Sequence, residues 1–569
     1  MADRGNSQPT TTDWVMRRIE AQPTLFAQTP NRIVIHGLEL VQSPDSPHAY
    51  RVNVWRNHAI EPVLGLAMPY LAFGGVTVDF VVGGYDDSLA FTNFTPADTE
   101  VIWLDIQRLS GGMEYPELLQ WLKSRLTHLR TLTTASILVA TWTDSSSSTA
   151  MLSQICEGLP GVFFADLGEC ARSSGKPVTD SRSEAIAGTP LTGSLHPVLA
   201  RELSCRWLPA LLLPPIKAVV LDLDQTLHSG VLGEDGVTGV RLTDGHRGLQ
   251  SYLSDLRARG IFLALLSRNE REDVEALFAQ REDYPLRWSD FSAAEVSWQP
   301  KSEGLRKIAE ALRIAPDAMV LVDDNPGELM EVVRQMPELH VVHAADDAKL
   351  TQRALSYCPG LWRWREDSAG AARVADLRAN SQRESVLRSA AGNDEYLASL
   401  NVLLTYRLSA TELLPRLQDL SVKTNQFNLA LRRFTAAELS DRLARPDCCV
   451  AAVALSDRLA DSGVIALIVC QRVGNALVIE EVCVSCRALG RTLEDAIVIG
   501  AIQRVPLFAN CESVTFRTSA GPRNQPARTW IERFAARAVP EEGEVTLAPS
   551  VIRNFALPPG LAHTTLYEH

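Results

Sequence analysis

The sequence predicts an α/β protein with three successive structural units. Residues 31–200 alternate short apolar runs with amphipathic segments, which is typical of the strands and helices of a parallel sheet. A second unit with the same alternation begins at Ile216. From about Asp394 the apolar runs are joined by short turns, which predicts antiparallel strands in an α+β unit. The predicted boundaries are a flexible N-terminal tail at 1–30, α/β domains at 31–205 and 214–362, a helical linker at 363–393 and an α+β domain at 394–569.

The size and composition of the chain exclude several classes of protein. Its 569 residues are enough for three or four domains of ~150 residues each, and 46% of them are apolar. The net charge of -13 argues against a general nucleic-acid binder. No run of about 20 residues is apolar enough for a membrane span, the polar start "MADRGNSQPTTTDW" is no secretory signal, and the ten cysteines show no paired zinc spacing. We therefore expect a cytoplasmic protein with reduced thiols that binds neither nucleic acid nor membrane.

The elements of the first unit follow from its apolar runs. The predicted strands are "RIVIHGLELV", "VTVDFVVGGYDD", "EVIWLDI", "ASILVATW" and "GVFFADLG". Between them, "YPELLQWLKSRLTHLRTL" has the spacing of an amphipathic helix. The stretch "LTGSLHPVLARELSCRWLPALLLPP" then predicts a helix and a Pro-rich connection to the second unit.

The second and third units are predicted in the same way. Strands of the second unit are "KAVVLDLD", "IFLALLS" and "AMVLVDD", followed by the short run "LHVVHA", and its helices include "HRGLQSYLSDLRARG" and "SEGLRKIAEALRI". The charged, Ala-rich stretch from Trp362 to about Asn393 predicts a pair of linking helices. In the third unit the strands are "CVAAVALSD", "GVIALIVCQRVG" and "ALVIEEVCVS", with helices at "TAAELSDRLA" and "TLEDAIVIGAIQRV".

Two aspartates end the first strand of the second unit. Asp222 and Asp224 follow the apolar run "AVVL", at the edge of a parallel sheet where ligands bind. Adjacent carboxylates repel unless a cation or a proton lies between them, and Mg²⁺ prefers such oxygen ligands. A capped strand end or turn is the structural alternative for this short motif.

Three further motifs carry polar side chains to the ends of strands or to a helix start. Ser267 ends the strand in "LLSRNE", Lys301 precedes a helix in "WQPKSE", and two acids end the strand in "VLVDDNPGE". The order of these motifs resembles the haloacid-dehalogenase (HAD) superfamily of phosphoryl-transfer enzymes. The resemblance implies that Asp222 is the nucleophile that attacks phosphorus and that Asp224 is a general acid and then a base.

The same resemblance implies a phosphate site and a metal site. The residues that would bind the phosphoryl group are Thr226, Ser267, Arg268 and Lys301. The residues that would hold Mg²⁺ are Asp222, Asp224 (through its backbone carbonyl), Asp323 and Asp324. Between the motifs there is room for a small hairpin, "HSGVLGEDGVTG", and single helices, but not for a large cap domain. An open site of this kind suits a bulky substrate or a neighbouring domain that acts as a lid.

Five motifs resemble the FkbH-like family of polyketide biosynthesis more closely. They are "LDLDQTLHSGVLGEDG", "WQPKSEGLRKIAEAL", "LVDDNPGELMEVVRQMPEL", "KTNQFNLALRRF" and "SCRALGRTLEDAIV". The resemblance implies transfer of a glyceryl group, or a related C3 acyl group, from 1,3-bisphosphoglycerate to the phosphopantetheine thiol of an acyl carrier protein, with dephosphorylation. The chain departs from the family at His228 and Ser229, where Trp and Gly are usual, and at Arg268, where Lys is frequent. His228 is either a phosphate contact or, as is commoner for a lone histidine, a surface residue.

The third unit resembles acetyltransferases of the GNAT type, in which a loop before a helix seats the phosphate end of coenzyme A. In this chain that loop contains Arg487, Gly490 and Arg491. Cys486 lies just before the loop, where arginines and a helix N-terminus would enrich its thiolate and make it a covalent acyl relay. A buried structural cysteine is the alternative. The polar residues of "KTNQFNLALRRF" predicted to contact the substrate or the pantetheine arm are Lys423, Asn425, Gln426 and Asn428, and a solvated loop is the alternative.

The first unit resembles a degenerate SGNH-hydrolase-like domain through "GGYDDSLAFTNF" and "VIWLDI", but it lacks a Gly-Asp-Ser nucleophile block. We therefore expect this unit to have a docking or scaffolding role and not to catalyse hydrolysis. Three functions therefore remain open: a glyceryl transferase, a stand-alone Mg²⁺-dependent phosphatase for small molecules, and an inactive assembly protein that docks carriers. The complete acid and lysine set argues against the third, and the missing cap and the pantetheine-type loop argue against the second.

Overall fold

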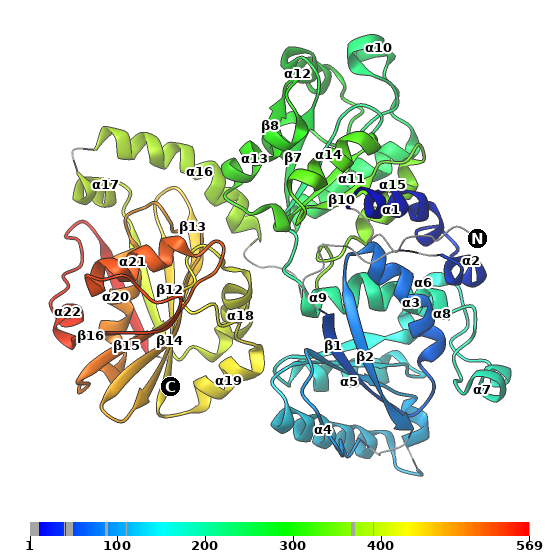
Figure 1. The fold of residues 1–569 in the computed structure, drawn as a ribbon, viewed down its shortest axis with the longest axis horizontal. Coiled ribbons are helices and arrows are strands. Elements are labelled where there is room, and N and C mark those ends of the chain that lie inside the picture. The colour runs from blue at the N-terminus through cyan, green and yellow to red at the C-terminus, as the bar shows by residue number, and fades with distance from the viewer. Residues whose placement is uncertain are drawn as a thin grey trace, which may run out of the picture. The chain divides into compact units, whose positions relative to one another are not determined.

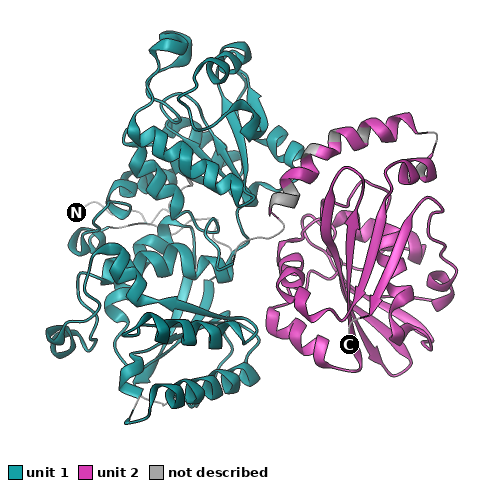
Figure 2. Cartoon of the chain, turned by 180° about the vertical axis from the view of Figure 1, so that it is seen from behind, with its two compact units in different colours: residues 1–366 teal, residues 367–569 magenta. Residues whose placement is uncertain are grey.

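The computed structural model describes residues 11–38, 40, 49–85, 89–109, 111–365, 370–390 and 392–567. Asp86 and Asp87, in the stretch compared with SGNH hydrolases, lie outside the described residues. The chain forms two compact units, Met1–Glu366 and Asp367–His569 (Figures 1 and 2). Unit 1 contains two parallel sheets, which confirms the predicted α/β class, and unit 2 contains one mixed sheet.

The first sheet of unit 1 is parallel and has the strand order β2–β1–β3–β4–β5. Its strands are β1 (Ala49–Arg56), β2 (Thr77–Tyr85), β3 (Thr99–Trp103), β4 (Ser136–Thr141) and β5 (Val162–Asp166). The helices of this part are α1 (Thr11–Leu25), α2 (Arg32–His36), α3 (Glu61–Phe73), α4 (Tyr115–Leu132), α5 (Ser146–Glu157), α6 (Leu167–Ser174), α7 (Ser181–Ala187), α8 (His196–Glu202) and α9 (Pro209–Leu212). Side chains alternate along β3, so that Val101 and Trp103 pack with α3 and α8 while Ile102 packs with α4 and α5.

Two sequence predictions for this sheet are wrong. The run "RIVIHGLELV" is not a strand, because Arg32–His36 is the short helix α2 and Ile33 is 80% exposed. Asn31 decides this locally: its side chain accepts hydrogen bonds from the N–H groups of Ile33 and Val34 and so caps a helix. Strand β1, "AYRVNVWR", was not predicted, because polar residues interrupt its apolar run.

The prediction of a flexible tail at 1–30 is also wrong for residues 11–25, which form α1. Trp14, Val15 and Leu25 on this helix are buried in unit 1. Gln22 donates to the backbone carbonyl of His343 at 2.7 Å and accepts from its N–H at 3.2 Å, so the helix satisfies both polar groups of an edge-strand residue. The polarity of the segment is that of an amphipathic helix with one buried face.

The second sheet of unit 1 is also parallel, with the order β10–β9–β6–β7–β8. Its strands are β6 (Ala218–Leu221), β7 (Phe262–Ser267), β8 (Phe291–Val296), β9 (Met319–Asp323) and β10 (His340–His343). Its helices are α10 (Leu232–Gly239), α11 (Asp244–Ala258), α12 (Arg271–Gln280), α13 (Lys301–Leu312), α14 (Pro326–Gln335) and α15 (Ala348–Ser356). The predicted hairpin after β6 is instead the short helix α10, closed by a single bridge between Ser229 and Arg241. The edge strand β8 was not predicted, because its side chains are only half-buried.

The two sheets of unit 1 share one continuous apolar core. This core runs from Tyr70 and Leu199 beside the first sheet, through Leu208 and Ile216, to Val219 and Leu263 in the second sheet. The predicted domains 31–205 and 214–362 therefore correspond to two sheets that pack within one compact unit.

Unit 2 is built on a sheet with the order β16–β15–β14–β13–β12–β11–β17. Its strands are β11 (Leu403–Leu408), β12 (Cys448–Ser456), β13 (Asp461–Val473), β14 (Ala476–Val484), β15 (Ser513–Ser519), β16 (Glu542–Leu547) and β17 (Ala562–Tyr567). Its helices are α16 (Gly370–Ser389), α17 (Asn393–Ser399), α18 (Leu414–Lys423), α19 (Ala436–Ala444), α20 (Glu494–Arg504), α21 (Gln525–Ala535) and α22 (Pro549–Arg553). Strands β12, β13 and β14 are antiparallel, as their short connections predicted. Strand β11, which was not predicted, also pairs antiparallel with β12, and β14 pairs with β15 in parallel.

Strands β14 and β15 diverge, and the chain itself fills the gap. The two strands pair only up to Ile479 and Phe516. Beyond that point, Leu429 N–H donates to the carbonyl of Val482 and Ser519 N–H donates to the carbonyl of Leu429. The segment 427–429 thus takes the place of a strand in this part of the sheet.

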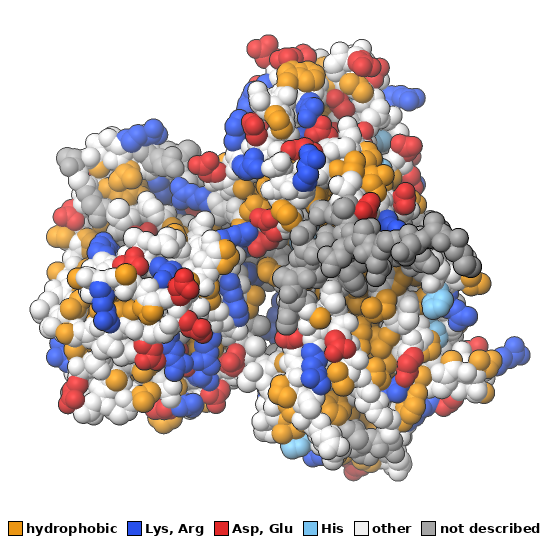
Figure 3. Space-filling model, viewed as in Figure 1, with side chains coloured by type: hydrophobic (Ala, Val, Ile, Leu, Met, Phe, Trp, Pro, Cys, Tyr) orange, Lys and Arg blue, Asp and Glu red, His pale blue; other side chains and the backbone are white. Residues whose placement is uncertain are grey.

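None of the helices in the described part of the chain is long and apolar enough to cross a membrane. On the face drawn in Figure 3, acidic and basic side chains are interspersed.

Candidate active site

The carboxyl ends of three adjacent strands bring the predicted acidic residues together. Strand β6 lies between β9 and β7, so Asp222 after β6 has Asp323 at the end of β9 on one side and Ser267 at the end of β7 on the other. The N–H of Asp222 continues the sheet by donating to the carbonyl of Val322 at 2.9 Å. The parallel register therefore fixes the mutual position of these side chains.

Lys301 is the cation of this cluster. It is the first residue of α13, is only 4% exposed, and donates from Nζ to Oδ1 of Asp222 at 2.7 Å and to Oδ2 of Asp323. Burial lowers the pKa of Lys301, but the two carboxylates outweigh burial and raise it overall. The lysine is therefore held in its charged form.

The pKa of Asp222 is raised. Burial is the main cause, Lys301 opposes it, and the neighbouring charge of Asp323 adds to it. A second cation at this edge would favour the ionised carboxylate that a nucleophile requires.

Three carboxylates are close enough to share a metal ion. Asp222, Asp323 and Asp324 each offer an oxygen, and these oxygens lie within 4.8 Å of one another. Burial and the charge of Asp323 raise the pKa of Asp324, as expected for like charges without an intervening cation. The donors are all hard oxygens, which fits Mg²⁺. The carboxylate of Asp224 is not one of these three groups and accepts hydrogen bonds elsewhere, so a contact of its backbone carbonyl with the metal stays a prediction.

Asp224 is held by three hydrogen-bond donors. Its Oδ1 accepts from His228 Nε2 at 3.1 Å and from the N–H of Leu232 at 2.9 Å, and its Oδ2 accepts from Asn269 Nδ2 at 2.8 Å. Burial raises the pKa of Asp224, but these hydrogen bonds outweigh burial and lower it overall. Asn269 also donates to Ser267 Oγ at 3.0 Å, so it ties the second motif to the first.

Sequence reasoning missed two of these roles. Asn269 was not singled out, although its position two residues after Ser267 at a strand end was a usable signal. His228 is neither a surface residue nor exposed to a ligand: it is fully buried, and its Nδ1 lies 3.1 Å from Tyr284 Oη.

The remaining predicted phosphate ligands differ in their surroundings. Thr226 is 1% exposed, and its Oγ1 has no hydrogen-bond partner in the described part of the chain, so it retains capacity for a phosphoryl oxygen or a water. Arg268 forms an ion pair with Glu328, with Nη2 and Oε1 2.9 Å apart, at a more exposed position. Trp298, which follows β8 at the same sheet edge, is 66% exposed and donates to Glu270 Oε1.

In unit 2, the residues predicted to bind the pantetheine arm are mostly used by the fold. Asn428 is fully buried: its Nδ2 donates to the carbonyl of Thr424 and its Oδ1 accepts from the N–H of Leu431. Lys423 donates to Asp419, and Asn425 accepts from Arg433. Gln426 is exposed.

Two residues of the predicted phosphate loop before α20, Gly490 and Arg491, form contacts within unit 2. Arg491 is 5% exposed, and its guanidinium pairs with Asp376 at 2.8 Å and with Asp457 at 3.3 Å. The N–H of Gly490 donates to Glu494 Oε1 at 3.0 Å. Arg487 is 7% exposed. Glu494 opens α20, so an acidic side chain lies in the first turn, next to the loop expected to seat a phosphate. The phosphate seat stays a prediction.

Cys486 is a free, half-buried thiol in the turn after β14. The ion pairs of Arg491 with two carboxylates remove one of the two arginines expected to activate it.

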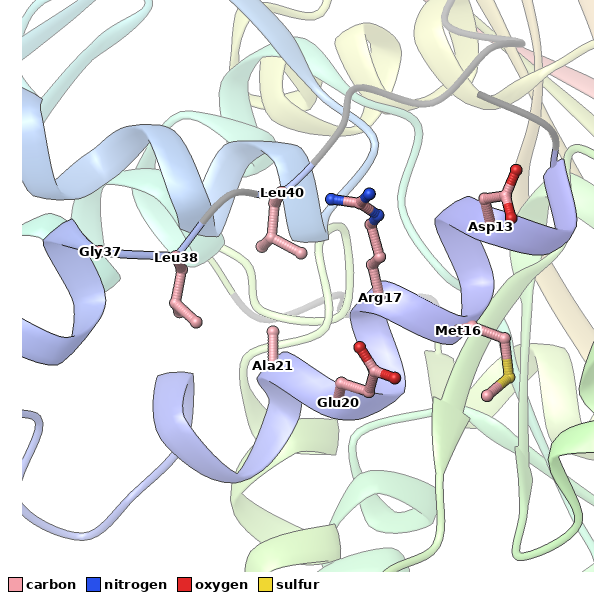
Figure 4. A pocket seen from close by; sticks show the side chains of 8 residues that line it. All are labelled: Asp13, Met16, Arg17, Glu20, Ala21, Gly37, Leu38 and Leu40. Atoms are coloured by element: carbon pink, nitrogen blue, oxygen red, sulfur yellow. The ribbon is translucent and has the colours of Figure 1, made fainter. Parts of the chain in front are cut away.

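A cavity of about 450 Å³ lies elsewhere in unit 1. Figure 4 shows side chains of α1 and of the following segment around it. Its lining residues are Asp13, Met16, Arg17, Glu20, Ala21, Gly37, Leu38 and Leu40. None of the predicted site residues lines this cavity.

No family model and no curated protein matches the chain. Among solved structures, the N-terminal part of the protein BF1531 from Bacteroides fragilis, which contains a phosphatase domain complexed with Mg, is 16% identical over 60% of this chain and 99% of that chain, with a TM-score of 0.44. A GCN5-related glucosamine N-acetyltransferase region of a fungal multi-domain GH3 β-N-acetylglucosaminidase is 10% identical over 94% of this chain and 68% of that chain, with a TM-score of 0.18. Both TM-scores lie below 0.5.

Proposed function

We propose that unit 1 is a Mg²⁺-dependent phosphatase that transfers a phosphoryl group to Asp222. One observation carries this proposal: Lys301 bridges Asp222 and Asp323 at the carboxyl edge of a parallel sheet, with Asp224 two residues further on. A capped strand end would not need a buried lysine between two acids, because that arrangement costs desolvation without stabilising the turn.

The side chains of the site account for both halves of such a reaction. An oxygen of Asp222 attacks phosphorus, and the bond from phosphorus to the leaving oxygen breaks. The leaving oxygen takes a proton from the protonated form of Asp224, which is the minor form because hydrogen bonds lower the pKa of this carboxyl. A water molecule then loses a proton to Asp224 and attacks phosphorus, which releases phosphate and restores Asp222. Lys301 would pair with a phosphoryl oxygen, and Thr226 and Ser267 would donate to others.

The metal would be held by Asp222, Asp323 and Asp324, with the backbone carbonyl of Asp224. When bound, Mg²⁺ supplies a positive charge that neutralises the phosphoryl oxygens and lets the anionic Asp222 approach them. Asn269 would keep Ser267 and Asp224 in their relative positions through its two hydrogen bonds.

The test is phosphate release by the purified chain with Mg²⁺ and acetyl phosphate, p-nitrophenyl phosphate or glycerol 3-phosphate. Asp222→Asn should lower turnover more than ~10³-fold, since it removes the nucleophile. Asp283→Asn is the matched control, because Asp283 pairs with Arg281 on the surface of the same unit. Full turnover of Asp222→Asn would refute the assignment of the nucleophile.

The finer proposal concerns the acyl group and rests on the resemblance to the FkbH-like family. The Cys486 thiolate would attack the acyl carbon of 1,3-bisphosphoglycerate and release inorganic phosphate, the Asp222 site would remove the remaining phosphate ester, and the carrier thiol would take the glyceryl group from the thioester. Thioester exchange is nearly neutral in free energy, which suits a relay. The free, half-buried thiol of Cys486 supports this candidate.

A mass measurement separates the two proposed functions. The holo carrier protein should gain one glyceryl group when incubated with the chain, Mg²⁺ and 1,3-bisphosphoglycerate. Cys486→Ala should abolish the gain, and Cys170→Ala, at another half-buried thiol, should not. Phosphate release without a mass gain on the carrier would leave the stand-alone phosphatase.

A further inference from the structure

Two buried side chains, His228 and Tyr284, extend a chain of hydrogen bonds from Asp224 into the core. His228 Nε2 lies 3.1 Å from Asp224 Oδ1, and His228 Nδ1 lies 3.1 Å from Tyr284 Oη. Both rings are 1% exposed or less. No water is expected to compete for these polar atoms, so each hydrogen bond is strengthened by its apolar surroundings.

The chemistry of Tyr284, His228 and Asp224 indicates which group donates and which accepts in each hydrogen bond. Tyr284 is a hydroxyl that can donate its proton to Nδ1, which then acts as an acceptor. A neutral imidazole that accepts at Nδ1 carries its proton on Nε2 and donates it to the carboxylate. Because the Asp224 carboxylate only accepts, the neutral tautomer that satisfies both contacts donates from Nε2 to Asp224 and accepts at Nδ1 from Tyr284.

The ring of Tyr284 is in contact with two side chains. Tyr284 packs edge-to-face against Phe278 on α12, with ring centroids 6.0 Å apart. Arg281 lies over the tyrosine ring, 4.9 Å from its centroid. The N–H of Leu232 and Asn269 Nδ2 also donate to the Asp224 carboxylate, on Oδ1 and Oδ2 respectively, and the side chain keeps 18% exposure for the proton it exchanges.

We propose that His228 is a positioning residue, oriented by Tyr284, which holds the Asp224 carboxylate in the orientation required for proton transfer. This inference rests on the proposed phosphatase function and adds a role to residues that contact neither phosphorus nor metal. Loss of orientation by about 1 Å is enough to cost ~100-fold in rate. His228 therefore acts through Asp224 and does not exchange protons with the substrate.

Enzyme kinetics on the full chain distinguish positioning from a merely structural role. His228→Ala should lower kcat/KM about 10–100-fold for glycerol 3-phosphate, whose alkoxide leaving group needs a proton, and less for p-nitrophenyl phosphate, whose leaving group does not. His228→Gln should recover part of the rate, because its amide can donate to Oδ1. Tyr284→Phe should lower kcat/KM less than His228→Ala does. The double variant should lower kcat/KM no more than His228→Ala alone, since the tyrosine acts through the histidine.

His196→Gln is the matched control, because His196 is a buried histidine of the same unit, 2% exposed, and is not one of the residues of the proposed site. It should leave the ratio of the two kcat/KM values unchanged. An equal loss of kcat/KM for both substrates in His228→Ala would overturn the positioning role.

A second measurement does not depend on turnover. Ring-¹⁵N-labelled histidine in the wild-type chain, with the His228 signals identified by their loss in His228→Gln, should show the proton on Nε2, and Tyr284→Phe should shift the Nδ1 resonance. A proton on Nδ1 would overturn the inference. Absence of phosphate release from all three phosphates would instead reject the proposed function, and the tautomer measurement would still decide whether His228 can donate to Asp224.

Discussion

The ammonium of Lys301 lies 2.7 Å from Oδ1 of Asp222 and also donates to Asp323, so one buried cation serves two buried carboxylates. With Asp324 beside them, the cluster has three acids and one base, an excess of negative charge. This excess is the physical reason to expect a divalent cation at the sheet edge.

Removal of the Lys301 charge should destabilise unit 1. Lys301→Met keeps most of the side-chain volume but leaves two buried carboxylates without their cation, which costs about 3–5 kcal/mol of unfolding free energy. Urea denaturation without Mg²⁺ measures this. Lys307→Met is the control, since Lys307 lies on the same helix, is 57% exposed and pairs with Glu295; it should cost at most ~1 kcal/mol. Equal losses in the two variants would contradict the bridging role.

Mg²⁺ should stabilise the wild-type chain by binding to the folded site. At ~100 times its dissociation constant a ligand adds about 2.7 kcal/mol, which thermal unfolding with Mg²⁺ or EDTA would register as a higher Tm. Asp323→Asn should remove most of this shift, because Asp323 is fully buried within the acidic group. An undiminished shift in that variant would place the metal elsewhere.

Glu481 should make the stability of unit 2 depend on pH. This β14 residue is 1% exposed and accepts from the N–H groups of Ala430, Arg432 and Val482. Burial raises its pKa to about 7, and the three N–H donors only partly offset burial. The pKa of Glu481 in the folded chain lies above its unfolded value of ~4.3. Protonation of Glu481 therefore stabilises the fold fully at a pH below ~4.3, and this contribution is lost as the pH rises through about 7.

Hydrogen exchange, corrected for its intrinsic pH dependence, should show this loss as falling protection of the amides of residues 427–434 between pH 5 and 8. In Glu481→Gln these backbone amides should be less protected from exchange at every pH, and their protection should not change with pH, because the glutamine amide does not titrate. A trend that survives in Glu481→Gln would assign the effect to another group.

Arg491 should prove to be a structural residue. Arg491→Ala leaves Asp376 and Asp457, both almost completely buried, with one partner fewer, so we expect a loss of several kcal/mol in the unfolding free energy of unit 2. The neighbouring exposed residue Arg458 gives the control, and Arg458→Ala should change stability little. If Arg491→Ala is as stable as Arg458→Ala, the buried network is not what holds the loop.

The polar residues at the strand ends of the second sheet could be predicted because the prediction depends only on residues adjacent in the sequence. An apolar run followed by Asp222 and Asp224, or by Asp323 and Asp324, places carboxylates at the carboxyl end of a strand. Parallel strands bring these ends to one edge whatever the details of packing. The two errors also have local causes. At "RIVIHGLELV" the Asn31 cap starts a helix in spite of the apolar run, and at residues 11–25 a mostly polar segment forms a helix with one buried apolar face.

The sequence by itself thus determined the α/β class, the acidic strand ends and the lysine that meets them. Only the tertiary structure decided which partner each polar group would take. Tyr284 reaches His228 from 56 positions away, and Arg491 reaches Asp376 across 115 positions. An arginine beside a glycine before a helix suits a phosphate loop and a buried ion pair equally well as a sequence. What separates the two is whether a carboxylate from a distant element is packed against it, because desolvation forces a buried charge to find its partner inside the protein.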